Sequence, residues 1–171
     1  MKITTLCFGN INRSPAAKYV LEKLAKDIGL EIEVDSAGTS NYNAGKKANK
    51  RMRDMMEERG YDLSDHRAKQ ITLELLDSSD IVVYMDDKNL KKMRTMFTPE
   101  QLGTKLVKLS MFSEFDDIED PHFATSDVAH AMFTTVIDQI IQASNDLLQQ
   151  VKMGTKIEGP SNNSDSGLFD W

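Results

Sequence analysis

Segments with the residue pattern of strands alternate with segments of helical periodicity along most of the chain, and this alternation limits the fold more than any other feature. The strand-like segments are rich in β-branched and apolar residues and lie at 2–8, 31–38, 80–85 and 105–112. The helix-like segments carry apolar residues three or four positions apart and lie at about 14–28, 47–60, 87–97 and 126–151. Such alternation predicts an α/β protein, in which a doubly wound parallel sheet is covered by helices on both faces.

The periodic part of the chain ends near residue 151, and residues 152–171 are rich in Gly, Ser, Asn and Asp. That composition is typical of a flexible segment. A chain of 171 residues has the usual size of one domain. We therefore expect one three-layer (αβα) domain over 1–151, followed by a flexible C-terminal tail over 152–171.

Charge and cysteine content exclude several classes of protein. The chain has 21 basic and 27 acidic residues, and its net charge of -6 argues against a general nucleic-acid binder. A single cysteine cannot form an internal disulfide, so nothing indicates an oxidising compartment. No apolar run approaches the roughly 18 residues of a membrane span. We expect a cytoplasmic protein without a membrane partner.

The only cysteine, Cys7, ends the first predicted strand, and Arg13 and Ser14 follow where the first predicted helix opens, with Ser14 as its N-cap and Pro15 as its first residue. In a doubly wound sheet, ligands bind beyond the carboxyl ends of the strands. Backbone amides at a helix N-terminus hold anions and favour a thiolate, and an arginine can bind two oxygens of a tetrahedral anion. The pattern predicts a nucleophile in an oxyanion cradle, and the alternative is a buried apolar cysteine.

The string CFGNINRSPAA, at residues 7–17, resembles the phosphate loop of the low-molecular-weight protein tyrosine phosphatases, whose pattern is Cys-x-Gly-Asn-x-x-Arg-Ser-Pro. Four further strings occur in the order and spacing of that family, namely DSAGTSNY (35–42), HRAKQI (66–71), VVYMDDKNL (82–90) and DPHF (120–123). The resemblance covers about residues 1–150. It implies a four-stranded parallel sheet with flavodoxin-like winding, and hydrolysis of phosphotyrosine in proteins or peptides and of small aryl phosphates.

This resemblance assigns roles in the reaction. Cys7 would attack phosphorus and carry a phosphocysteine intermediate, while Arg13 and the loop amides hold the equatorial oxygens. The phosphate-binding loop comprises Phe8, Gly9, Asn10, Ile11, Asn12 and Ser14. The general acid and base would be Asp120. Taken alone, Asp120-Pro121 reads as a turn, and three neighbouring acids, Asp116, Asp117 and Glu119, are alternatives.

Supporting residues surround these groups. Ser14 can donate a hydrogen bond to the Cys7 thiolate, and Asn10 is suited to a left-handed turn. The resemblance implies a network that joins these two residues to Ser36 and His66, and a contact of Asp86 with the loop arginine. Without it, His66 would be a solvated loop residue and Asp86 a helix cap. The expected walls of the substrate pocket are Phe8, Tyr42, His122 and Phe123.

Two positions differ from the family pattern. Most members have a second cysteine where this chain has Asn12, so a protective disulfide with Cys7 cannot form. His122 and Phe123 stand where two tyrosines, or similar residues, usually follow the acid, and the imidazole could alter specificity or pH dependence.

Alternatives to a tyrosine phosphatase remain. A protein-arginine phosphatase usually has threonine after the loop asparagine, where this chain has Ile11. Arsenate could enter as a phosphate mimic, although the additional cysteines of arsenate reductases are absent. From another class, a phosphotyrosine-binding module without turnover would use the same loop. Phosphate and other oxyanions are expected ligands, and neither a metal nor a cofactor is expected, since ligand spacing and nucleotide-binding motifs are absent.

Basic residues follow the predicted Tyr42 wall, at Lys46, Lys47, Lys50, Arg51 and Arg53. A run of charge is usually a solvated helix face. On an acidic protein, however, a basic rim would steer acidic phosphopeptides towards the loop.

Overall fold

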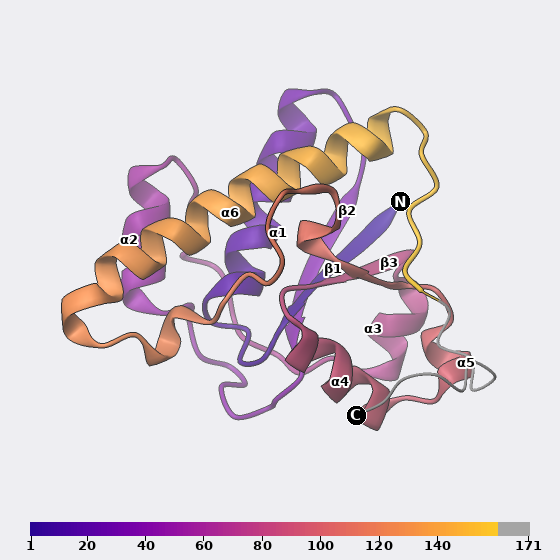
Figure 1. The fold of residues 1–171 in the computed structure, drawn as a ribbon, viewed down its shortest axis with the longest axis horizontal. Helices are drawn as coiled ribbons and strands as arrows, with labels where there is room; N and C mark the ends of the chain where they lie inside the picture. The colour runs from indigo at the N-terminus through magenta and orange to yellow at the C-terminus, as the bar shows by residue number, and fades with distance from the viewer. Residues whose placement is uncertain (161–171) are drawn as a thin grey trace.

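The computed structural model describes residues 1–160 and has a four-stranded parallel sheet at its centre (Figure 1). The strands are β1 (Lys2–Cys7), β2 (Glu33–Gly38), β3 (Ile81–Tyr84) and β4 (Leu106–Lys108), in the order β2-β1-β3-β4. The chain therefore leaves β1 in one direction to form β2 and returns to its other side to form β3. The point between β1 and β3 is the switch point at which ligands bind in open α/β sheets.

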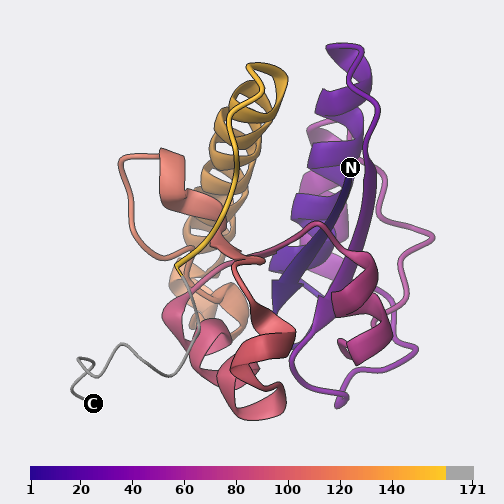
Figure 2. The ribbon, with the colours of Figure 1, turned by 90° about the vertical axis from the view of Figure 1, so that its right-hand side faces the viewer.

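Helices cover both faces of the sheet. They are α1 (Arg13–Asp27), α2 (Lys50–Glu58), α3 (Leu73–Ser78), α4 (Asp87–Met96), α5 (Pro99–Leu102) and α6 (Ser126–Lys152). Helices α1 and α6 lie side by side on one face with α2 beside them, and α3, α4 and α5 lie on the other face (Figures 1 and 2).

The two hydrophobic cores follow from the period of two along each strand. In β3, Val83 packs with α1, α2 and α6, whereas its neighbour Val82 packs with α3, α4 and α5. All four residues of β3 are buried, as a strand covered on both faces requires. The expected three-layer, flavodoxin-like α/β fold is thereby confirmed.

Some boundaries differ from the predicted ones. The strand expected over 105–112 ends at Lys108, and a 3-10 helix, η1 (Leu109–Phe112), follows it. The helix expected over 47–60 begins only at Lys50, because the Asn49 side chain accepts hydrogen bonds from the amides of Arg51 and Met52 and so caps α2. Helix α1 begins at Arg13, so Ser14 lies in its first turn and the prediction of Ser14 as N-cap was wrong. The helices α3 and α5 were not predicted.

The packed part of the chain continues beyond the predicted boundary at residue 151. Ile157 is buried in the core of α1 and α6, and the Gly159 amide donates to the carbonyl of Thr104 beside β4 at 2.8 Å. A Cβ at Gly159 would lie 1.6 Å from the Leu106 carbonyl oxygen, so only glycine fits so close to the strand. The first part of the tail predicted over 152–171 is therefore held against the domain at Ile157 and Gly159, and residues 161–171 lie outside the described residues. Between residues 1 and 160, no helix has the length and apolar character that crossing a membrane requires.

Candidate active site

The loop between β1 and α1 lies at the switch point of the sheet, with Cys7 at one end and Arg13 at the other. Cys7 is the last residue of β1 and 2 % exposed, and Arg13 is the first residue of α1 and 1 % exposed. Asn10 turns the loop with a left-handed φ of 52°. The end of β2 fixes the other side, because the amides of Thr39 and Ser40 donate to the carbonyls of Cys7 and Phe8 at 2.9 and 3.0 Å.

The sulfur of Cys7 has polar neighbours. Its Sγ lies 3.1 Å from the Ser14 hydroxyl oxygen and accepts a hydrogen bond from the Asn10 amide at 3.3 Å. Cys7 also packs in the core, as the apolar alternative required, but it additionally lines a hollow of about 150 Å³ at the mouth of the loop. The placement of Ser14 in the first turn of α1 explains why its hydroxyl reaches the sulfur instead of capping the helix.

Asn10 joins the loop to β2 and to a buried histidine. Its Nδ2 donates to the hydroxyls of Ser14 and Ser36 at 2.8 and 3.1 Å, and its carbonyl oxygen lies 2.7 Å from His66 Nε2. The structure thus brings together the four residues of the expected network. Burial disfavours the imidazolium and lowers the pKa of His66, although the carbonyl of Asn10 opposes this shift.

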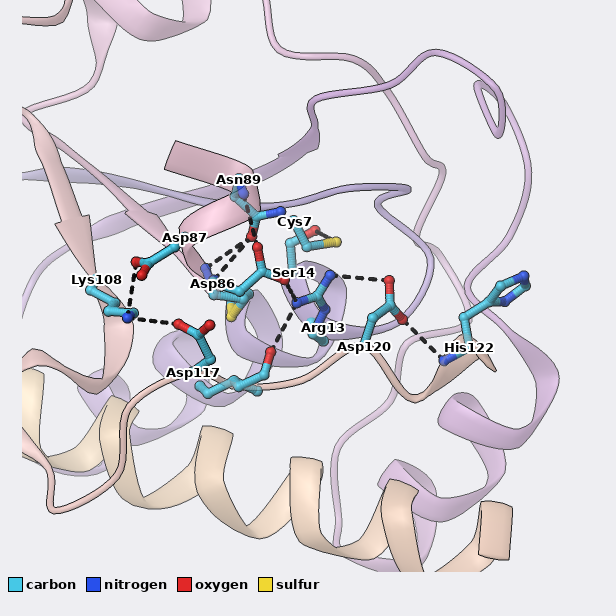
Figure 3. A network of polar contacts seen from close by, with 12 residues as sticks. Cys7, Arg13, Ser14, Asp86, Asp87, Asn89, Lys108, Asp117, Asp120 and His122 are labelled. Atoms are coloured by element: carbon cyan, nitrogen blue, oxygen red, sulfur yellow. Dashed lines mark hydrogen bonds and ion pairs between the residues drawn. The ribbon is translucent and has the colours of Figure 1, made fainter. Parts of the chain in front are cut away.

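The Arg13 guanidinium is held from three sides (Figure 3). Its Nη1 donates to Asp86 Oδ2 at 2.5 Å and to the Ile118 carbonyl at 2.9 Å, and its Nη2 donates to Asp120 Oδ2 at 3.0 Å. Burial opposes the positive charge, but nearby Cys7, Asp120 and Asp86 outweigh it, so the pKa of Arg13 is raised. Asp86 is at the same time the N-cap of α4, because its side chain accepts a hydrogen bond from the Asn89 amide. Asp86 is thus both a partner of the loop arginine and a helix cap.

Asp120 is the acid that faces the loop. Its side chain lies between Arg13 and the backbone amide of His122, which donates to Oδ1 at 3.0 Å (Figure 3). Pro121 begins a 3-10 helix, η2 (Pro121–Phe123), for which Asp120 is the N-cap. Of the alternative acids, Asp117 pairs with Lys108, and neither Asp116 nor Glu119 lines the hollow that contains Cys7.

Aromatic side chains surround the entrance. Phe8, Tyr42 and Phe123 are 51 %, 78 % and 81 % exposed, and all three line the hollow above Cys7. The His122 ring meets the Phe123 ring edge-on, with centroids 5.1 Å apart. A wider hollow of about 660 Å³ adjoins the first, shares Phe8, Asp120 and Phe123 with it, and extends over Arg13 towards α4. An entrance of this kind suits a flat ring that carries an anionic group.

Sequence reasoning missed several residues of the site. A Cβ at Gly38 would lie 2.6 Å from the Phe8 carbonyl oxygen, so the loop requires glycine there. Asn43 Nδ2 donates to the Gly9 carbonyl at 3.3 Å, and the Asn49 amide donates to the Ile11 carbonyl at 2.8 Å. The DSAGTSNY string covers Gly38 but gives no sign of this close contact. In the described part of the chain, no His, Cys, Asp and Glu side chains gather in a group of three or more that could hold a metal ion.

The site has a buried thiol in a loop of backbone amides, and an arginine and a carboxylic acid lie beside it. On a flavodoxin-like sheet, this arrangement defines an α/β protein with a cysteine-centred oxyanion site. The family model for low molecular weight phosphotyrosine protein phosphatase matches residues 2–156. The human low molecular weight phosphotyrosine protein phosphatase is 32 % identical over 152 residues, which cover 85 % of this chain and 92 % of that protein.

Two solved structures are also similar. A protein tyrosine phosphatase from Entamoeba histolytica is 28 % identical, with a TM-score of 0.83 over 91 % of this chain and 99 % of that one. A Drosophila arginine phosphatase is 28 % identical, with a TM-score of 0.79 over 89 % of this chain and 98 % of that one. The chain belongs to the low molecular weight phosphotyrosine protein phosphatase family, and it is an enzyme of the protein-tyrosine-phosphatase class.

Proposed function

We propose that this enzyme hydrolyses phosphotyrosine in proteins or peptides, and small aryl phosphates, through a phosphocysteine intermediate on Cys7. The observation that carries the proposal is the position of Asp120, which lines one hollow with Cys7 and the adjoining hollow with Arg13, and whose Oδ2 accepts a hydrogen bond from Arg13 Nη2 at 3.0 Å. A phosphoryl group in the loop would take its hydrogen bonds from the backbone amides and from Arg13.

The first step transfers the phosphoryl group. Cys7 Sγ forms a bond to phosphorus as the bond to the phenolic oxygen breaks, and protonated Asp120 gives its proton to the leaving phenolate. Asp120 Oδ2 accepts a hydrogen bond from Arg13 Nη2, so a phosphoryl oxygen bound at Arg13 would take over that donor and leave Asp120 to face the leaving group. In the second step Asp120 removes a proton from water, which attacks phosphorus and releases phosphate and the Cys7 thiolate. The Ser14 hydroxyl then stabilises that thiolate.

The aromatic entrance favours phosphotyrosine over phosphoarginine, because Phe8, Tyr42 and Phe123 can enclose a phenyl ring. An arginine phosphatase is the second candidate, since the similar Drosophila structure is one. Ile11, which lines the hollow where that branch has threonine, weighs against it. The proposed ligands of the loop also include inorganic phosphate and other oxyanions, arsenate among them. The proposed location of the enzyme is the cytoplasm.

The test is hydrolysis of para-nitrophenyl phosphate, a phosphotyrosine peptide and a phosphoarginine peptide in EDTA. Cys7→Ser is expected to abolish turnover, and Asp120→Ala to lower it by about 10²- to 10⁴-fold. Turnover of the phosphoarginine peptide alone would overturn the choice of substrate. Binding of phosphate or vanadate by a folded wild-type protein without any turnover would show that the loop is a binding module and not a catalyst.

A further inference from the structure

The segment that carries Asp120 has no regular secondary structure between η1 and η2, and a few side-chain and backbone contacts hold it. Ile118 is fully buried, its amide donates to the Met85 carbonyl at 2.9 Å, and its carbonyl accepts from Arg13. The Ser110 hydroxyl donates to the Asp116 carbonyl. These contacts place the backbone of the segment, which we call the acid segment (113–120), against the ends of β3 and β4.

Lys108 adds an ionic contact to this segment. It is the last residue of β4, and its Nζ lies 2.6 Å from Asp117 Oδ1 and 3.0 Å from Asp87 Oδ1 (Figure 3). Asp117 lies three residues before Asp120, and Asp87 follows Asp86, which holds Arg13. Lys108 therefore ties the segment that carries the acid to the helix end that orients the arginine.

The surroundings of Lys108 distinguish it from an ordinary surface ion pair, which contributes little. Its side chain is 21 % exposed, and its ammonium group forms ion pairs with two carboxylates, those of Asp117 and Asp87. Burial alone would lower the pKa of Lys108, but hydrogen bonds and charges from Asp117 and Asp87 outweigh it and raise that pKa. Lys108 is thus cationic at neutral pH and offsets the repulsion among the carboxylates of the acid segment and the start of α4.

We propose that Lys108 is a positioning residue for the general acid, and that it sets the place of Asp120 over the leaving-group oxygen through Asp117. This inference rests on the acid role proposed above for Asp120. A displacement of about 1 Å can cost a factor of about 10² when a group must meet a reacting atom. Loss of the Lys108 contact is therefore expected to impair proton donation without removing the nucleophile or the loop.

The experiment compares Lys108→Met with wild type on two substrates. Phenyl phosphate releases a phenol as basic as tyrosine, with a pKa of about 10, and needs the acid most. Para-nitrophenyl phosphate releases a more acidic phenol and needs it less. We expect kcat/KM to fall about tenfold for phenyl phosphate, within the range that a general acid contributes, and clearly less for para-nitrophenyl phosphate. Lys108→Arg should restore most of the loss. Lys23→Met, which breaks the exposed Lys23–Asp27 pair at the other end of α1, is the matched control.

The same substitution in an Asp120→Ala background separates positioning from a general structural effect. Lys108→Met should then cause no further loss, because the group on which it acts is absent. An equal loss on both substrates, or an undiminished loss in the Asp120→Ala background, would overturn the inference. If Asp120→Ala alone leaves phenyl phosphate hydrolysis unchanged, the proposed acid role fails instead. Thermal unfolding of every variant shows whether the fold is intact.

Discussion

At the scale of single residues, Asn12 is the most unusual feature of the site. Its side chain is buried beside Cys7 in the loop, and neither its Oδ1 nor its Nδ2 has a hydrogen-bond partner among residues 1–160. The resemblance to the family implies a second cysteine at this position, where this chain has Asn12. The loop therefore keeps its shape without a thiol that could protect Cys7.

We expect prolonged treatment with peroxide to inactivate the enzyme irreversibly. Without a neighbouring thiol, the Cys7 sulfenic acid proceeds to sulfinic and sulfonic acids, and glutathione rescues activity only early. Asn12→Cys should recover far more activity with dithiothreitol after the same exposure, because a disulfide can intercept the sulfenic acid. Complete recovery of the wild type by dithiothreitol after long exposure would contradict this expectation.

His66 links stability to pH. Its pKa is lowered in the folded state by burial, so the unfolded chain binds a proton more readily. Neutral His66 therefore contributes fully to the free energy of unfolding above its unfolded-state pKa of about 6.5. That contribution is lost as the pH falls towards the lower pKa of the folded state. The free energy of unfolding should fall less between pH 7.5 and pH 5 in His66→Gln than in wild type. His130→Gln, at an exposed position of α6, should keep the wild-type difference.

At the scale of elements, the sequence predicts the long, periodic segments and not the contacts between them. The strands β1, β2 and β3 and the helices α1, α4 and α6 have clear periods, so they could be predicted within a few residues. The helices α3 and α5 span six and four residues, too short to show a period. Asp120 contacts Arg13 across 107 residues of chain, and only the resemblance of the loop and DPHF strings to a family indicated that pair. No sequence pattern indicated the role of Lys108, because its contacts with Asp117 and Asp87 depend on its place as the last residue of β4.

The end of β2 forms the loop support, and Gly38 is its critical residue. Gly38→Ala would push the added methyl group into the Phe8 carbonyl and the Asn10 backbone. We expect a destabilisation of about 1–3 kcal/mol and a large loss of kcat, because the amides proposed to hold the phosphoryl group would move. Gly29→Ala is the control: its φ of 68° makes alanine unfavourable by about 1–2 kcal/mol, but nothing lies within 4 Å of the added Cβ. Gly29→Ala should therefore lose stability while retaining kcat, and equal kcat in the two variants would refute the role of Gly38.

At the scale of the whole molecule, an acidic protein presents basic residues beside its site. Lys46 Nζ lies 4.7 Å from the centroid of the Tyr42 ring at the entrance. The helix α2, which follows, carries three of the five basic residues, and its Lys50 pairs with Asp54 on the same helix. Lys46 and Lys47 are exposed, and Lys46 lies at an entrance that would receive a dianionic phosphoryl group. Their charge is therefore expected to affect substrate association and not the chemical steps.

Reversal of charge at Lys46 and Lys47 tests this steering. At low salt we expect kcat/KM for an acidic phosphotyrosine peptide to fall about tenfold, since the field of the rim accelerates encounter. The loss should shrink at high salt, where screening shortens the reach of charge to about 3 Å at 1 M. Lys23→Glu with Lys26→Glu makes the same change in net charge at the far end of α1 and should have little effect. Hydrolysis of para-nitrophenyl phosphate by the same variants shows whether the substitutions have damaged the Tyr42 wall. If the phosphopeptide is hydrolysed at the wild-type rate at low salt, the basic residues are a solvated surface without a role in substrate capture.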